Sequence, residues 1–204
     1  MGRPKGNPKK EHYYQAAKKH GYRARSAYKL RQMATKHNLL KGVRIVIELC
    51  SSPGGWTQVL KEMEPGLEVI AADLSPMLPI EGVRFVQGDI TDEAIIGEIE
   101  SLARGEADLV ISDCAPKVSG MWDLDVTRQL FLAEATLDLG HRLLGPKGKV
   151  LAKVFQGPGF EEFMARSKSK FGSVKLIKPE ASRKTSAEIY ILAIRPKNKA
   201  KDTA

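Results

Sequence analysis

The sequence lacks the features that mark membrane and secreted proteins. Its 204 residues contain no apolar run near the roughly 18 residues that a membrane-spanning helix needs. The first ten residues, MGRPKGNPKK, have no apolar stretch of the secretory type, and Gly6 stands where a myristoylation signal has Ser or Thr. We therefore expect a cytoplasmic protein that does not associate with membranes, and the length favours one folded domain.

Cysteine and histidine are also scarce. Cys50 and Cys114 are the only cysteines, and the four histidines are scattered along the chain. Two thiols make neither a disulfide framework nor a zinc site, and the histidines show no metal-ligand spacing. The sequence therefore predicts no metal site.

Two common nucleotide-binding motifs are absent as well. The chain contains neither a G-x-G-x-x-G fingerprint nor a G-x-x-x-x-G-K-[ST] loop. Instead, an apolar strand predicted at 43–49 runs into the small-residue turn 51–55, and a helix follows. Such a turn brings backbone N–H groups and a helix N-terminus close to a ligand at the carboxyl end of a strand. The pattern favours a nucleoside ligand without a pyrophosphate, with a turn that binds nothing as the alternative.

Positive charge gathers at the two ends of the chain. The net charge is +9, and residues 1–41 hold twelve lysines and arginines against a single acid, Glu11. Tyrosines lie among these basic residues, as they do where nucleic-acid bases stack. The pattern indicates a phosphate-binding surface attached to an acidic domain, with a solvated arm that has no specific partner as the alternative. We expect residues 1–20 to be a flexible basic arm, 21–195 the folded domain and 196–204 a flexible basic tail.

Strands and helices alternate through the rest of the chain. Strands are predicted at 43–49, 68–72, 83–87, 107–112, 149–155, 173–178 and 188–194, and helices near 25–37, 55–63, 92–104, 124–144 and 159–170. Such alternation predicts a parallel α/β sheet with helices on both faces. About nine residues separate the last two strands, which is too short for a parallel crossover, so the last strand should be antiparallel. This seven-stranded arrangement resembles the Rossmann-like fold of class I methyltransferases.

Two carboxylates follow neighbouring strands of the predicted sheet. Asp73 ends the second strand and can accept hydrogen bonds from the hydroxyls of a nucleoside ribose. Asp89 follows the third strand and could accept from an adenine amino group. Each alone could be a turn or helix-capping residue. Together with the turn 51–55 they place three candidate ligand contacts at one edge of the sheet.

Lys153 interrupts the otherwise apolar strand 150–155. Burying an ammonium group costs several kcal/mol unless it is paired. Asp113 and Glu188 are the expected partners, because the strands that carry them should be neighbours, and Lys29 lies on the early helix. A purely structural ion pair is the alternative to a catalytic group.

Six segments in this order together resemble the FtsJ/RrmJ-type RNA ribose 2′-O-methyltransferases, over roughly residues 20–195. The segments are 48–56, 69–79, 87–89, 112–120, 153–157 and 178–191. The resemblance implies methyl transfer from S-adenosylmethionine to a ribose in RNA, with a uridine of large-subunit (23S-type) ribosomal RNA as the first candidate. A compact chain of this kind is expected to be a monomer.

The resemblance also assigns roles to single residues. The catalytic residues that it implies, called the tetrad below, are Lys29, Asp113, Lys153 and Glu188. The cofactor-binding residues that it implies are Gly54, Gly55, Trp56, Asp73, Asp89 and Asp113. The basic residues expected to bind RNA are Arg23, Arg25, Arg31, Lys36, Lys178, Arg183 and Lys184.

Two residues depart from the family pattern. Glu48 stands where the family usually has Asp, and Cys50 stands where it usually has Gly, so a side chain enters a turn that is usually bare backbone. Three other functions stay open at this point: ribose methylation of transfer RNA, methylation of a base or a protein, and a non-catalytic RNA-binding assembly factor on the same fold.

Overall fold

The computed structural model describes residues 8–104, 106–182 and 186–197. Its centre is one seven-stranded sheet in the order β3-β2-β1-β4-β5-β7-β6. The strands are β1 (Ile45–Leu49), β2 (Glu68–Asp73), β3 (Val83–Gln87), β4 (Ala107–Ser112), β5 (Leu144–Phe155), β6 (Phe171–Ile177) and β7 (Glu188–Pro196). The helices are α1 (Pro8–Lys19), α2 (Ala27–His37), α3 (Gly55–Met63), α4 (Glu93–Leu102), α5 (Trp122–Leu143) and α6 (Phe160–Lys170).

The strand directions confirm the fold predicted from the sequence. Strands β1 to β5 are parallel to one another, whereas β7 lies antiparallel between β5 and β6. The reversal follows from the short connection between β6 and β7, which cannot span the sheet as a crossover helix does. As a result, the amino end of β7 meets the carboxyl ends of the parallel strands, and Glu188 pairs with Phe155 across β5 and β7.

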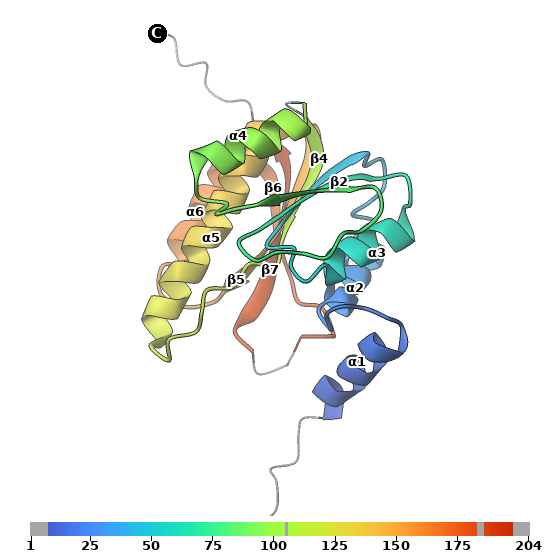
Figure 1. The fold of residues 1–204 in the computed structure, drawn as a ribbon. Helices are drawn as coiled ribbons and strands as arrows, with labels where there is room; N and C mark the ends of the chain where they lie inside the picture. The colour runs from blue at the N-terminus through green and yellow to red at the C-terminus, as the bar shows by residue number, and fades with distance from the viewer. Residues whose placement is uncertain (1–7, 105, 183–185, 198–204) are drawn as a thin grey trace, which may run out of the picture.

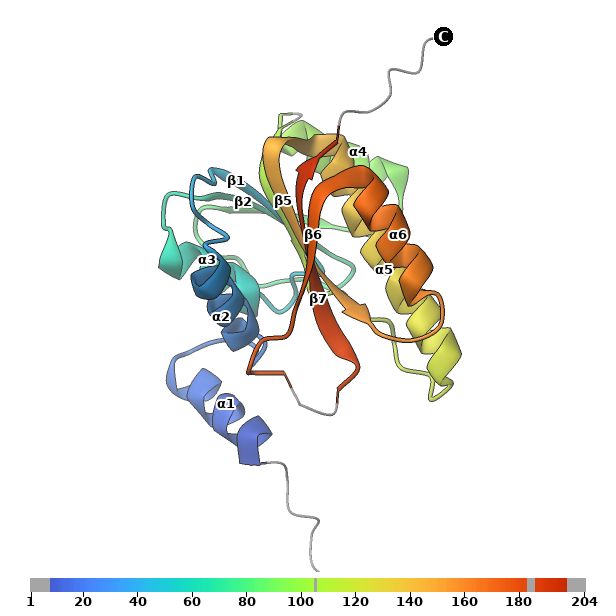
Figure 2. The same cartoon turned by 180° about the vertical axis from the view of Figure 1, so that it is seen from behind.

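Helices cover both faces of the sheet (Figures 1 and 2). Helices α2 and α3 pack on one face, and α4, α5 and α6 pack on the other. Consecutive residues of β4 alternate between the two cores: Leu109 and Ile111 pack under α2 and α3, and Val110 packs under α5. Because both faces of the central strands are covered, these strands are apolar almost throughout.

Helix α1 lies within the segment expected to be a flexible arm. It contacts α2 through Tyr13. The Tyr13 hydroxyl accepts a hydrogen bond from Gln32 Nε2 (3.1 Å), and the centres of the Tyr13 and Tyr28 rings are 5.4 Å apart. The segment is polar and basic, and its contact with α2 is made by an aromatic ring rather than by an apolar stripe. Hydrophobic periodicity therefore gave no signal for a helix here. The expected flexible tail falls mainly on residues 198–204, outside the described part of the chain.

Candidate active site

The four residues of the tetrad meet at the edge of the sheet where β4 and β5 end and β7 begins. They form two ion pairs. Lys29 Nζ lies 2.6 Å from Glu188 Oε1, and Lys153 Nζ lies 3.2 Å from Asp113 Oδ1. Both ammonium groups are largely buried, with 11% of the Lys29 side chain and 7% of the Lys153 side chain exposed. Burial of this kind is tolerated because each cation has a carboxylate partner.

Lys153 is held by backbone groups as well as by its ion pair. Its ammonium donates to the carbonyl oxygen of Asp113 at 2.5 Å, and its own carbonyl accepts from Gln129 Nε2 at 2.8 Å. On the neighbouring strand, Tyr190 is its register partner. These contacts give the ammonium a defined place near the end of β5.

Tyr190 connects the two ion pairs, and the sequence did not single it out. Its hydroxyl donates to Asp113 Oδ1 at 2.6 Å, and Lys29 Nζ lies 5.9 Å from the centre of its ring. Burial raises the pKa of Tyr190, and the charges of Asp113 and Glu188 raise it further. The phenol therefore stays protonated and keeps donating to Asp113. The sequence did contain a signal for this role of Tyr190. It lies two residues after Glu188 on the same strand, and alternate residues of a strand share a face.

Ser182 supports Glu188 from the connection between β6 and β7. Its hydroxyl donates to Glu188 Oε1 at 2.9 Å. Burial alone would raise the pKa of Glu188, but the charge and hydrogen bond of Lys29, together with Lys153 and Ser182, lower it below its ordinary value. Glu188 is therefore a carboxylate at neutral pH. Because Tyr190 donates to Asp113 and its ring centre lies 5.9 Å from Lys29 Nζ, the two ion pairs lie close to each other.

The small-residue turn after β1 is packed against residues 20–26. A Cβ at Gly55 would lie 2.9 Å from the Cβ of Ala24, so a larger residue there would push the two segments apart. Gly54 has φ +105°, which other residues rarely adopt. Arg23, expected to bind RNA, donates to the carbonyl oxygens of Pro53, Leu78 and Pro79. In the structure, the Arg23 side chain therefore links the turn to the β2–β3 connection through hydrogen bonds.

Trp56 turns its side chain into the core. It is 3% exposed, its indole N–H donates to the carbonyl of Ser26 at 2.9 Å, and its ring lies 5.9 Å from that of Tyr190. It joins the start of α3 to α2 and to the tetrad. A contact between Trp56 and a cofactor at the sheet edge would therefore be made by its backbone.

Asp73 and Asp89 lie at the carboxyl ends of β2 and β3. Asp73 accepts from the backbone N–H groups of Ser52 (2.9 Å) and Ser75 (2.7 Å), one on each carboxylate oxygen. Asp89 Oδ1 accepts from the N–H and hydroxyl of Thr91, and these hydrogen bonds lower its pKa. A carboxylate can accept about four hydrogen bonds. Both groups therefore keep acceptor capacity for a ligand.

Cys50 and Cys114 form a disulfide, which the sequence did not predict. The two residues are 64 positions apart, and only the sheet brings them together. Leu49 of β1 pairs with Ser112 of β4, so the residues that follow these parallel strands emerge side by side. Cys50 lies at the start of the small-residue turn and Cys114 follows Asp113 directly. The bond therefore ties the turn to the segment that carries a tetrad residue.

Glu48 lies beneath the same turn and is 2% exposed. Thr57 Oγ1 donates to its Oε2 at 2.7 Å. Burial raises the pKa of Glu48 to about 8, with smaller contributions from the charges of Asp113 and Asp73 and an opposing one from Thr57. The side chain is therefore protonated at neutral pH.

Comparison with known proteins identifies the family. The model of the FtsJ-like methyltransferase family matches residues 22–196. The chain belongs to this family. Two relatives are called ribosomal RNA large subunit methyltransferase E. The one from Methanothrix thermoacetophila is 46% identical over 183 residues, which are 90% of this chain and 71% of the relative. The one from Azoarcus sp. is 45% identical over 184 residues, which are 89% of this chain and 90% of the relative.

A solved structure shares the fold of this methyltransferase. It is the crystal structure of a protein assigned as a ribosomal RNA methyltransferase from Plasmodium falciparum, with a TM-score of 0.77. The match covers 87% of this chain and 100% of the other, at 24% sequence identity. The comparisons therefore confirm the expected family, the Rossmann-like fold and the methyltransferase class. In the part of the chain that the structure describes, no three His, Cys, Asp or Glu side chains could together hold a metal ion, and no helix is long and apolar enough to cross a membrane.

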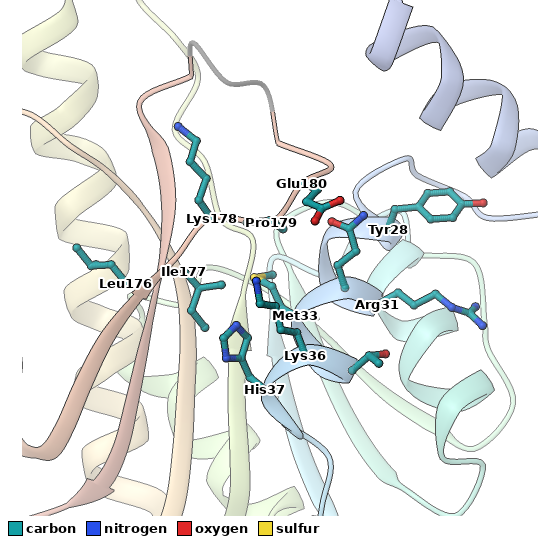
Figure 3. A pocket seen from close by; sticks show the side chains of 12 residues that line it. Tyr28, Arg31, Met33, Lys36, His37, Leu176, Ile177, Lys178, Pro179 and Glu180 are labelled. Atoms are coloured by element: carbon teal, nitrogen blue, oxygen red, sulfur yellow. The ribbon is translucent and has the colours of Figure 1, made fainter.

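The methyltransferase has a pocket of about 500 Å³ between α2 and the end of β6 (Figure 3). Two residues expected to bind RNA, Lys36 and Lys178, line it together with His37, and in Figure 3 Lys36 and His37 lie on the side of α2 that faces β6. Met33 and Ile177 are apolar parts of its wall. The pocket therefore combines apolar and cationic groups with one carboxylate, Glu180.

The pocket is connected to the tetrad through the segment that contains Ala181 and Ser182. Gln32 lines the pocket and accepts from the backbone N–H of Ala181 at 2.9 Å, and the next residue, Ser182, donates to Glu188. Arg31 is also at the pocket but is paired with Glu62 at 2.7 Å. Arg25 precedes α2 and is partly exposed. The other expected RNA-binding residues, Arg183 and Lys184, lie outside the described residues.

Replacing Glu48 by Gln is expected to make stability less dependent on pH. The ordinary pKa of a glutamate is 4.5, and the pKa of Glu48 in the fold is about 8, so between these values the folded protein holds a proton that the unfolded chain has lost. The free energy of unfolding should therefore fall as pH rises from about 4.5 to about 8. Each unit of pKa shift corresponds to about 1.4 kcal/mol. In urea unfolding at pH 5.5 and 8.5, the free energy of unfolding of Glu48→Gln relative to the wild type should be higher at pH 8.5 than at pH 5.5.

The matched control for this prediction is Glu64→Gln, because Glu64 is an exposed carboxylate at the end of α3. It should leave the pH dependence of the wild type unchanged. Equal slopes with pH for Glu48→Gln and the wild type would contradict a raised pKa at Glu48.

Proposed function

We propose that this methyltransferase transfers a methyl group from S-adenosylmethionine to a ribose 2′-hydroxyl of large-subunit ribosomal RNA, and that the nucleotide is a uridine. The observation that carries the proposal is the tetrad: two buried ion pairs, Lys29–Glu188 and Lys153–Asp113, at the sheet edge beside the turn after β1. Relatives at 45–46% identity called ribosomal RNA large subunit methyltransferase E support the choice of RNA.

The residues around the turn suit S-adenosylmethionine. The backbone of Gly54 and Gly55 is at the N-terminus of α3, where a ligand carboxylate would be favoured. Asp73 would accept from the ribose hydroxyls of the cofactor, and Asp89 from its adenine amino group. Both keep acceptor capacity beside their present hydrogen bonds. When bound, the cofactor supplies an activated methyl group on a positively charged sulfur.

The protein's part in the reaction is to place the 2′-hydroxyl and stabilise the charge that develops on its oxygen. Lys153 Nζ is the group proposed to face that oxygen. It lies 3.2 Å from the Asp113 carboxylate and 2.5 Å from the Asp113 carbonyl oxygen, and these two groups hold it in place. In this proposal Lys153 donates a hydrogen bond to the oxygen as negative charge develops on it. The oxygen–methyl bond forms as the sulfur–methyl bond breaks, the cofactor leaves as a neutral thioether, and the hydroxyl proton passes to water.

The second ion pair would position the substrate. Glu188 is a carboxylate and can accept from the 2′-hydroxyl, while Lys29 can contact the neighbouring phosphate. Holding a nucleophile and an activated carbon in line at roughly 3–3.5 Å can supply much of the rate. The pocket between α2 and β6 would hold the RNA on one side of the tetrad, with Lys36 and Lys178 contacting phosphates. Arg25, which precedes α2, would contact a phosphate outside the pocket.

The test uses RNA from the source organism with this gene deleted. The purified protein is incubated with that RNA and with S-adenosylmethionine labelled on its methyl group, and the product is digested with alkali. Alkali cleaves RNA through a free 2′-hydroxyl, so a methylated ribose leaves a labelled dinucleotide. We expect label in a uridine-containing dinucleotide from the large-subunit RNA.

Other outcomes would contradict particular parts of the proposal. Label in a dinucleotide from transfer RNA would contradict large-subunit RNA as the substrate and would support ribose methylation as the reaction. Label only in mononucleotides would move the reaction to a base. No label together with measurable RNA binding would favour a non-catalytic assembly factor.

Replacing Lys36 by Ala is expected to weaken RNA binding and reduce its dependence on salt. The logarithm of the binding constant falls with the logarithm of the salt concentration in proportion to the number of phosphates contacted. Loss of one contact should lower that slope by about 1 and leave cofactor affinity unchanged. Filter binding between 50 and 300 mM salt measures the slope. Lys147→Ala is the control, because Lys147 is exposed on the part of β5 far from the tetrad, and a Lys36→Ala slope equal to that of Lys147→Ala would contradict the contact.

A further inference from the structure

Trp122 is an exposed aromatic residue at the edge of the sheet where the tetrad lies, and none of the roles above uses it. It is the first residue of α5, at the end of the segment that begins with Asp113. Its exposed fraction is 49%, whereas the other tryptophan of the chain, Trp56, is 3% exposed. A tryptophan half in water has a large apolar surface available for a partner.

The ring of Trp122 is fixed against the strand that carries Lys153. It is stacked on Phe155, with ring centres 6.0 Å apart and an angle of 15° between the planes. Its indole nitrogen also lies beside Gly157, where a Cβ would be 3.4 Å away. Phe155 is two residues beyond Lys153 and pairs with Glu188 in the sheet. The indole therefore lies at the same edge of the sheet as the two tetrad ion pairs.

The segment that leads to Trp122 is also held in place. The buried carboxylate of Asp125 accepts from the N–H and hydroxyl of Ser119, both at 2.8 Å, and from the N–H of Gly120 at 3.3 Å. These hydrogen bonds fasten the segment to the first turn of α5. The ring is thus pre-positioned, and a partner that stacks on it would lose little of its binding energy to ordering the protein.

We propose that the solvent-facing side of Trp122 stacks on a nucleobase of the substrate RNA, at or directly beside the nucleotide that is methylated. This inference rests on the proposed function. A ribose at the tetrad brings its own base and those of its neighbours to this edge of the sheet, and Trp122 provides a flat aromatic surface there. Val118 (75% exposed) and Met121 (67% exposed) are further exposed apolar residues of the segment that leads to Trp122. Because every base has an aromatic face, such a contact supplies affinity and orientation rather than sequence selectivity.

The test compares Trp122→Ala and Trp122→Phe with the wild type on an unmodified transcript of the large-subunit RNA. We expect Trp122→Ala to raise the KM for RNA roughly tenfold, while the KM for S-adenosylmethionine stays unchanged. Trp122→Phe keeps a ring on Phe155 and should stay within about threefold of the wild type. Phe131→Ala is the matched control, since Phe131 is an exposed aromatic (58%) nine residues further along the same helix.

Tryptophan fluorescence gives a direct second readout. The chain has only two tryptophans, and Trp56 is buried. Saturating RNA should quench the emission of the wild type, because a stacked base quenches an indole. In Trp122→Phe the quenching should vanish, although RNA still binds, as measured by the anisotropy of a labelled transcript.

Different results would overturn different statements. Wild-type RNA kinetics in Trp122→Ala, or RNA quenching that persists in Trp122→Phe, would overturn the stacking contact and leave the proposed function standing. Loss of activity in Trp122→Ala only on assembled ribosomal subunits, and not on free RNA, would assign the surface to a protein partner and overturn the contact with RNA. A wild type that neither binds nor methylates RNA would overturn the proposed function and this inference with it.

Discussion

Replacing Lys153 by Ala is expected to slow methyl transfer about a thousandfold or more, while the Kd for S-adenosylmethionine changes little. In the proposed mechanism, Lys153 contacts the substrate hydroxyl and does not contact the cofactor. Loss of one well-placed donor to a developing anion costs about 100- to 1000-fold, and loss of the group that orients the hydroxyl toward the methyl carbon adds to this. Single-turnover assays with labelled cofactor measure the rate, and calorimetry measures the affinity.

The controls must separate chemistry from folding. Removing Lys153 leaves the Asp113 carboxylate without its ion-pair partner, which costs stability, so thermal unfolding of each variant is needed beside the assay. Lys153→Arg keeps the positive charge and should retain more activity than Lys153→Ala if the role is electrostatic. Lys147→Ala, on the same strand, should match the wild type. A Lys153→Ala variant with an intact fold and lost cofactor affinity would contradict the assignment, since Lys153 would then belong to the cofactor site.

Breaking the disulfide is expected to lower the free energy of unfolding by about 4 kcal/mol. Cys50 and Cys114 close a loop that spans 64 positions, and cross-linking a loop of that length removes conformational freedom chiefly from the unfolded chain. For a protein of this size, such a loss lowers Tm by roughly 10 °C. Urea unfolding of the oxidised wild type, the wild type in dithiothreitol and Cys114→Ser measures the difference.

The last two of these samples serve as controls for each other. Reduced wild type and Cys114→Ser should unfold at similar urea concentrations, and dithiothreitol should have no effect on Cys114→Ser. We also expect both to bind S-adenosylmethionine more weakly, because the small-residue turn begins at Cys50 and would lose its tie to the Asp113 segment. Equal stability of oxidised and reduced wild type would contradict a stabilising disulfide, and two free thiols under non-reducing conditions would contradict the bond itself.

Most of the fold was predictable because its signals are local. Apolar runs such as 107–112 indicate buried strands, and the helical spacing of Trp56, Val59, Leu60 and Met63 indicates α3. The antiparallel direction of β7 followed from a connection too short for a crossover. Helix α1 was missed because it contacts α2 through Tyr13 rather than through an apolar stripe. The start of β5 at Leu144 was missed because Gly145 and Pro146 are typical of a turn.

The sequence by itself determined the class of fold, the family and the kinds of charged residue at the sheet edge. These properties depend on residue type and order, which a chain carries without being folded. The tertiary structure decided which residues touch. It brought Cys50 and Cys114 into bonding distance and placed Tyr190 between the two ion pairs. It also buried the side chain of Trp56 in the core and directed the hydrogen bonds of Arg23 to the β2–β3 connection. Contacts between residues far apart in sequence depend on which strands lie side by side and on the register in which they pair, and the pattern of one strand does not identify its neighbour.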